Sequence, residues 1–292
     1  MVTEKETNET AKSKSPMKII GIVIVIAAIA IGAGAFWYVN YQIPHNEAVE
    51  SFNSAASGLE ERNAELDKAV SELQMLATSG DKPLDSSILD AASVAIGEAQ
   101  GSKKVTPEMP TDTADISVAA SEIKTLGNYD EELDALEIAW SNLDSSIQQF
   151  KQVVNPTEQF VIQRLTGLPN ITGIEAVTEN NDPNGNLGKA GGYTATVYFT
   201  SDLVDQSKVY LSGEHTVIVD AGCDGGGAIE VYANEEDAEK RLTYLSSFDG
   251  GILSSGSHTV VGTCLIRTSN NLTASQQQAM EQAIIEGLTL LG

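Results

Sequence analysis

The chain has 292 residues, of which 41 are acidic and 17 basic, and its formal net charge at pH 7 is −24. Nucleic acid and anionic lipid headgroups repel a surface of this charge, so the composition argues against a nucleic-acid-binding protein. One long apolar run near the N-terminus stands apart from this polar, acidic background.

The apolar run extends over 21 residues, from Ile19 to Val39, and contains no charged residue, proline, asparagine or glutamine. As an α-helix it would be about 31 Å long, close to the roughly 30 Å hydrocarbon core of a bilayer. Lysines precede the run, whereas the first basic residue after His45 is Arg62. This asymmetry predicts a transmembrane helix over 19–39, a cytoplasmic tail over 1–18 and an extracytoplasmic location for everything that follows.

A cleaved secretory signal is the alternative interpretation of the same run. Ala33-Gly34-Ala35 has the small residues of a cleavage site. An uncleaved anchor is favoured because the apolar run continues through Val39, and Trp37 belongs to the aromatic residues expected at headgroup level. Both interpretations place the rest of the chain outside the cytoplasm, where a disulfide between the two cysteines, at 223 and 264, is permitted, with two buried free thiols as the alternative.

Residues 40–155 are expected to form a helical bundle or coiled-coil stalk. Apolar residues recur in alternating steps of three and four from Val49 to Ala77, interrupted by Asn63, a residue type that fixes register in parallel dimers. A second such seam runs from Ile116 to Val154, with a break expected at Gly127. We expect the two long helices to fold back as an antiparallel hairpin, with a short helix over 84–100 as third member; a parallel homodimer is the alternative. Further expectations are a buried Trp140, and a single helix face formed by Ile88, Ala91 and Ala95.

Residues 156–292 are expected to form a C-terminal α+β domain with a largely antiparallel sheet. Its first helix is expected to be capped by Asn155, with Glu158 completing a capping box, and two later helices by Asn234 and by Thr273 with Gln276. Alternation at Ile174, Ala176 and Thr178 predicts the first strand, and a content rich in tyrosine, threonine, valine and phenylalanine predicts the second. The strands are expected near 174–178, 193–200, 216–219, 228–232 and 259–267.

Two blocks, 227–241 and 260–276, resemble uncharacterised membrane-anchored proteins of Gram-positive bacteria. Those proteins are also similar in having an N-terminal span, a helical segment and a C-terminal module. The resemblance implies a location at the bacterial cell envelope, and it implies no particular activity.

Four patterns in the sequence are candidate sites. Cys264, with His215 and Arg267, resembles a sortase-like site, although a buried thiol is the ordinary role of a cysteine in an apolar strand. The oxygen-rich segment from Asp182 to Asn186 resembles part of a calcium loop, but its composition is also that of a hairpin turn. The glycine-rich segment 220–227 lacks the features of a phosphate-binding loop, and the three histidines, at 45, 215 and 258, lack zinc-ligand spacing.

The sequence therefore predicts a membrane-anchored, extracytoplasmic protein that acts in binding, sensing or assembly at the cell envelope and is not an enzyme. No catalytic, cofactor-binding or metal-binding residue is assigned, and no cofactor is expected. The expected partners are the membrane and an unidentified envelope protein, with no nucleic acid. The alternatives are an envelope enzyme that uses Cys264 and His215, and a module that binds a small ligand or cation through the Asp182 segment or the glycine-rich loop.

Overall fold

A computed structural model describes residues 16–251 and 255–292, with side chains described at position 24 and from 27 onward. The chain divides into two compact units. The first comprises Met1–Lys68 and Gln100–Asp130, and the second comprises Ala69–Ala99 and Glu131–Gly292. Most of the expected cytoplasmic tail, residues 1–15, lies outside the described residues.

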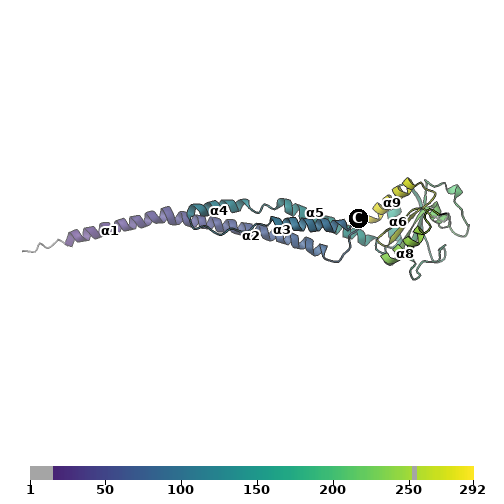
Figure 1. The fold of residues 1–292 in the computed structure, drawn as a ribbon, viewed down its shortest axis with the longest axis horizontal. Helices are drawn as coiled ribbons and strands as arrows, with labels where there is room; N and C mark the ends of the chain where they lie inside the picture. The colour runs from purple at the N-terminus through teal and green to yellow at the C-terminus, as the bar shows by residue number, and fades with distance from the viewer. Residues whose placement is uncertain (1–15, 252–254) are drawn as a thin grey trace, which may run out of the picture. The chain divides into compact units, whose positions relative to one another are not determined.

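The first unit begins with helix α1 (Pro16–Trp37), which passes through a π-helical turn (Tyr38–Gln42) into helix α2 (Ile43–Ala77) (Figure 1). A search of the described residues found no helix with enough length and apolar character to cross a membrane. The seam predicted on α2 is confirmed in outline. Its members Phe52, Leu59, Leu66, Val70 and Leu73 are buried. The predicted Val49 and Ala56 are only partly buried, and their neighbours Ala48 and Ala55 are buried in their place.

Helix α4 (Thr113–Thr125) packs against the first half of α2 and runs in the same direction. His45 Nδ1 lies 3.0 Å from Thr113 Oγ1 near the start of both helices. Further along, Arg62 Nη2 donates to the carbonyl of Leu126 at 2.9 Å. The expected antiparallel pairing of the two long helical seams is therefore wrong. The two helices can run parallel because residues 103–112 return along α2, from near Asn63 to near His45. The apolar seams in the sequence do not predict this return path.

Asn63 has its partners within the chain. Its amide donates to the carbonyl of Lys104 at 2.9 Å and accepts from the Tyr129 hydroxyl at 2.7 Å. The same hydroxyl accepts from the Lys104 amide at 2.9 Å. The predicted helix break at Gly127 is confirmed: its φ is +69°, and a Cβ there would lie 2.6 Å from the side chain of Leu59.

In the second unit, helices α3 (Ser87–Ser102) and α5 (Asp130–Gln152) contribute buried residues. Helix α3 buries Ala92 and Ala99 but exposes Ala91, so the expected face is turned by about one residue. The prediction for Trp140 on α5 is wrong, because this side chain is 42% exposed. Position 140 fits the heptad spacing, but the buried stripe of α5 passes through Leu136 and Leu143 instead.

The α+β fold with an antiparallel sheet is confirmed. Five strands pair antiparallel in the order β1-β2-β3-β5-β4. Their bounds are β1 (Ile171–Ala176), β2 (Tyr193–Ser201), β3 (Gly226–Tyr232), β4 (His258–Val261) and β5 (Cys264–Thr268). The other elements are helices α6 (Glu158–Leu165), α7 (Val217–Ala221), α8 (Glu235–Ser246) and α9 (Ala274–Thr289), with 3-10 turns at Gln206–Lys208 and Gly222–Gly225.

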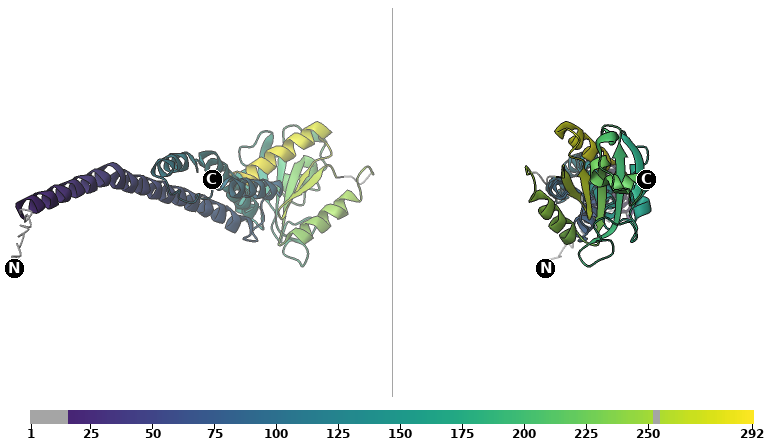
Figure 2. Two further views of the ribbon diagram at one scale, coloured as in Figure 1. Left: turned by 60° about the vertical axis from the view of Figure 1, so that its left-hand side comes forward. Right: turned by 90° about the vertical axis from the view of Figure 1, so that its right-hand side faces the viewer.

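Helices cover both faces of this sheet (Figure 2). Helices α6 and α9 pack on one face, where Phe199, Ile229, Ile266 and Ile284 are fully buried in the main core. Helix α8 packs on the opposite face, and a smaller cluster there includes Tyr193, Tyr232, Ala238, Leu245 and Leu265. Side chains on a strand point alternately to the two faces, so neighbouring residues of β3 and β5 enter different environments.

Three local predictions are wrong in this domain. Thr157, not Asn155, caps α6, because its hydroxyl accepts from the Phe160 amide, while Asn155 adopts a positive φ of +47°. The expected strand at 216–219 is the start of helix α7, capped by Thr216. The expected strand 259–267 is a hairpin of two strands, because Gly262 turns the chain at φ +59°. The caps predicted at Asn234 and at Thr273 with Gln276 are confirmed.

The end of α5 is bonded directly to this hairpin. The Val153 carbonyl accepts from the Thr263 amide at 2.9 Å, and the Asn155 amide donates to the Thr263 hydroxyl at 2.6 Å. Thr194 Oγ1 on β2 also donates to the Asn155 side chain at 2.7 Å. Within this unit, the helical and α+β parts are therefore joined by hydrogen bonds at the very point where one ends and the other begins.

Candidate functional site

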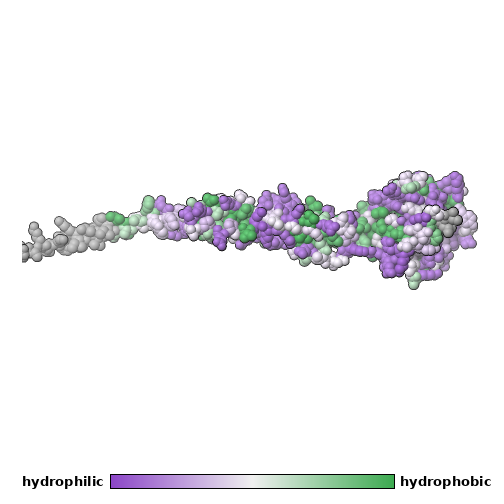
Figure 3. Space-filling model, in the orientation of Figure 1, coloured by the Kyte–Doolittle hydropathy of each residue, from purple (hydrophilic) through white to green (hydrophobic). Residues whose placement is uncertain are grey.

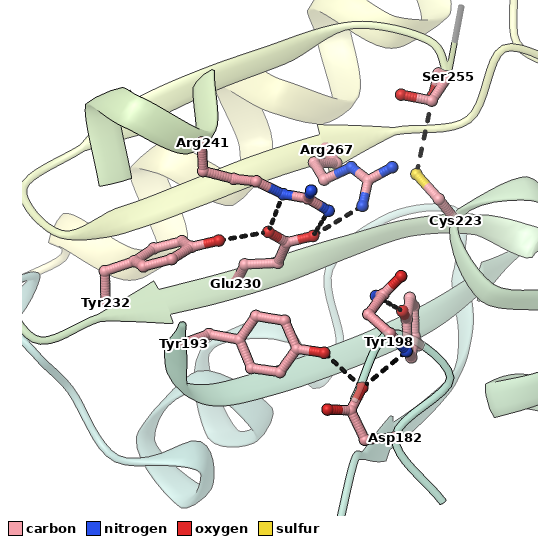
Figure 4. A network of polar contacts seen from close by, with 10 residues as sticks. Asp182, Tyr193, Tyr198, Cys223, Glu230, Tyr232, Arg241, Ser255 and Arg267 are labelled. Carbon is pink, nitrogen blue, oxygen red and sulfur yellow. Dashed lines mark hydrogen bonds and ion pairs between the residues drawn. The ribbon is translucent and has the colours of Figure 1, made fainter. Parts of the chain in front are cut away.

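A buried ionic network occupies the face of the sheet beneath α8 (Figure 4). Glu230 on β3 is fully buried and accepts from Arg267 Nη1 on β5 at 2.7 Å. Arg241 on α8 donates to the same carboxylate through Nε at 3.0 Å and Nη2 at 3.2 Å. The Tyr232 hydroxyl adds a fourth hydrogen bond at 2.7 Å. The network therefore ties one helix and two strands to a single carboxylate.

The electrostatics of Glu230 suit a structural role. Burial alone would raise the pKa of this carboxyl, but the charges and hydrogen bonds of Arg267 and Arg241 outweigh it and hold the pKa below its ordinary value. Each of the two carboxylate oxygens of Glu230 already accepts two hydrogen bonds. A carboxylate that is ionised at neutral pH and whose oxygens are already hydrogen-bonded is poorly suited to proton transfer, which requires a pKa near the working pH.

The alternative site of Cys264 with His215 and Arg267 is not assembled. Cys264 and Arg267 are three residues apart on β5, so their side chains point to opposite faces of the sheet. Cys264 enters the main core, where burial raises the pKa of its thiol to about 12. Arg267 faces Glu230, and His215 lies in the segment before α7, where its amide donates to Asp220 at 3.2 Å. An activated thiolate next to an imidazolium is therefore not what this arrangement provides.

Cys223, not Cys264, lies beside Arg267 (Figure 4). Its sulfur is 3.9 Å from the Ser255 carbonyl, and burial raises the pKa of its thiol to about 11 although Arg267 acts in the opposite direction. A thiol with a raised pKa is a poor nucleophile at neutral pH. Both cysteines are free thiols, so the disulfide that the location would permit is not present.

The Asp182 segment forms a turn that uses its own carboxylate. Asp182 accepts from the amides of Asn184, Asn186 and Leu187 at 2.6 to 3.0 Å and from the Tyr193 hydroxyl. Burial alone would raise the pKa of Asp182, but these hydrogen bonds lower it. Both carboxylate oxygens of Asp182, which a calcium ion would need, are therefore already hydrogen-bonded. No group of three or more metal-ligating side chains was found among the described residues.

The glycine-rich segment 220–227 packs closely against the sheet. A Cβ on Gly227 would lie 2.3 Å from the carbonyl oxygen of Arg267 and from the ring of Phe199. Gly226 is confined in the same way by the backbone of β2. These glycines allow β3 to lie close to its neighbours, so the segment is a packed connection and not a phosphate cradle.

A polar cavity of about 540 Å³ lies where α8 ends and β4 begins. His258 lines it with a side chain that is only 5% exposed. Its Nε2 lies 3.0 Å from Ser246 Oγ and 3.5 Å from Asp249 Oδ2. The other lining residues are Gly250, Gly256, Ser257, Asn270, Leu272 and Gln277.

The three side chains at this cavity do not form a catalytic triad. In a triad the carboxylate holds Nδ1 while the hydroxyl faces Nε2. Here Ser246 and Asp249 share Nε2, and Nδ1 of His258 is buried with no hydrogen-bond partner in the described part of the chain. The cavity offers hydroxyl, carboxylate, imidazole and amide groups that suit hydrogen bonding to a small polar ligand. Sequence reasoning missed it because its residues lie on separate elements without motif spacing.

Comparisons with protein-family models, with curated proteins and with solved structures found no match to this chain. The resemblance to membrane-anchored proteins of Gram-positive bacteria therefore stays a prediction.

Proposed function

We propose that this chain is a single-span protein of the cell envelope, anchored by residues 19–39 with its N-terminus in the cytoplasm. Its helical segment and α+β domain act outside the cytoplasm in binding, sensing or assembly, without catalysis. In this proposal the helices, starting from α2, serve as a spacer between the bilayer and the α+β domain.

The exposed apolar surface of α1 and the π turn carries this proposal. The large apolar side chains described there are 51% to 73% exposed: Ile24, Ile29, Ile31, Phe36, Trp37, Tyr38, Val39 and Tyr41. Figure 3 shows hydrophobic surface where the coloured part of this helix begins. Burying apolar surface is favourable by about 25 cal/mol per Å², and a contiguous exposed patch of this kind marks an interaction with a membrane or a protein. A bilayer supplies such burial along the whole charge-free run.

The α+β domain supports binding more than catalysis. Its most buried carboxylate, Glu230, is held by two arginines and a tyrosine, and its most buried thiol, Cys264, is packed in the core. The polar cavity at His258 instead presents hydrogen-bonding groups at a partly open surface. A second candidate function, recognition of a small polar ligand, is favoured by this cavity alone.

Topology and localisation test the main proposal. A C-terminal tag on the full chain should be digested by protease added to intact cells, and the protein should sediment with the membrane fraction. A tag that stays protected, or a protein recovered wholly in the cytosolic fraction, would overturn it. For the second candidate, ¹H–¹³C NMR of the histidine rings during a titration with neutral sugars should move the His258 signal while His45 and His215 serve as internal references.

A further inference from the structure

Three aromatic side chains form a stacked ladder where α1 ends and α2 begins. The rings of Trp37 and Tyr41 have centroids 5.7 Å apart with an interplanar angle of 25°. The ring centroids of Tyr41 and His45 are 6.0 Å apart, and the two ring planes are nearly parallel, with an interplanar angle of 1°. Positions four residues apart lie on the same face of a helix, so the three rings make one continuous stripe. Trp37 and Tyr41 are 54% and 51% exposed.

The π turn inside this stripe keeps its backbone satisfied. The Ile43 amide donates to the Tyr38 carbonyl, which is the wider spacing of a π-helix. The side chain of Asn40 donates to the Phe36 carbonyl at 2.8 Å. An unsatisfied carbonyl near hydrocarbon costs several kcal/mol, so this local bond suits a turn at the edge of a bilayer.

His45 ends the ladder and begins the helical bundle. Its bond to Thr113 fixes the first residue of α4 beside the start of α2. His45 follows Trp37 by eight residues, or about 12 Å along a helix. A headgroup layer is roughly 5–8 Å thick on each side, so rings at Trp37 and Tyr41 can lie within it while His45 is in water.

Resting on the membrane anchoring proposed above, we propose that the Trp37–Tyr41–His45 ladder marks the lipid–water boundary of the outer leaflet. Trp37 and Tyr41 lie among phospholipid headgroups, and His45 makes the first contact of the bundle directly above them. The partner is the bilayer and not a second copy of the chain, because no charged side chain interrupts the sequence from Ile19 to Gln42 and the exposed rings lie at its outer end. Amphipathic aromatic rings concentrate at this depth of a membrane.

The two tryptophans of the chain, Trp37 and Trp140, allow a matched test. The full-length variant Trp140→Phe retains only the ladder tryptophan, and Trp37→Phe retains only the control on α5. Each is reconstituted into phosphatidylcholine vesicles that contain lipids brominated at a shallow or a deep acyl position, and vesicle flotation is measured in parallel.

We expect Trp37 fluorescence to be quenched at least about twofold more by the shallow than by the deep bromines, with Trp140 unaffected by either. A tryptophan introduced by Tyr41→Trp in the Trp37→Phe/Trp140→Phe background should lie about 6 Å further out than Trp37. If the protein floats but Trp37 is not quenched, or is quenched more by the deep bromines, the proposal that the ladder marks the lipid–water boundary is wrong, and the proposed membrane anchoring still stands. Unquenched Trp37 together with crosslinking between copies would assign the ladder to a second chain. Protein that fails to float overturns the anchoring itself.

Discussion

Replacing Glu230 by glutamine should be among the most destabilising single changes in the α+β domain. The substitution keeps the shape of the side chain but removes its negative charge. Arg267 on β5 and Arg241 on α8 then remain without their carboxylate, with side chains that are 10% and 19% exposed. Breaking a buried ion pair from one side costs about 3–5 kcal/mol, because the remaining charge stays uncompensated. Arg241 can regain some water through its exposed edge, so we expect about 3 kcal/mol for Glu230→Gln.

Amide hydrogen exchange of the full chain, followed by mass spectrometry on peptides from β3 and α8, measures the loss of stability. We expect it as a lower free energy of opening of these two elements. The matched control is Glu236→Gln on the same helix, where an 80% exposed carboxylate contacts Lys240 at 2.8 Å and is worth under about 0.5 kcal/mol. The pKa of Glu230 is lower in the folded than in the unfolded protein. The contribution of its charge to stability is therefore complete above the unfolded-state pKa and is lost as pH falls through the folded-state pKa. The difference between wild type and Glu230→Gln should therefore be full at pH 7 and shrink in acid. Equal effects of the two substitutions at pH 7 would refute a stabilising role for the network.

Three further outcomes are expected. Gly262→Ala should lower the free energy of unfolding in urea by at least about 2 kcal/mol, because φ is +59° and the new Cβ would lie 2.5 Å from a backbone carbonyl oxygen. The control Gly80→Ala, at a position with positive φ but open space, should lower it by only about 1 kcal/mol. Cys223 and Cys264 should react slowly with a disulfide reagent at pH 8 in the native protein, because burial raises the pKa of both thiols, and both should react in urea. A fast reaction of the native protein would contradict this. Tyr129→Phe removes a hydroxyl bonded to two partners and should increase amide exchange near residue 104, and unchanged exchange there would count against the bond.

Local signals in the sequence were sufficient for most of the fold. The caps at Asn234 and Thr273, the break at Gly127 and the strands near 193–200 and 228–232 each depend on neighbouring residues, and each is confirmed. The valines and isoleucine after Thr216 favour a strand, but the Thr216 hydroxyl caps a helical turn there instead.

What the sequence did not reveal depends on long-range placement. The direction of α4 against α2 is set by the return path through residues 103–112, and two apolar seams fit either direction equally well. The Glu230 network joins residues up to 37 positions apart through strand pairing and the docking of α8. A single sequence contains no signal for those contacts, and the same holds for the His258 cavity.

The bonded junction between α5 and the β4–β5 hairpin has a mechanical consequence. A pull along α5 would reach Val153, whose carbonyl is held by the Thr263 amide and whose side chain is fully buried in the main core. Such a load would be delivered straight into the sheet at the turn between two of its strands, without a slack linker to absorb it. Tension or torque on the helices would thus act on the same strand, β5, that carries Arg267.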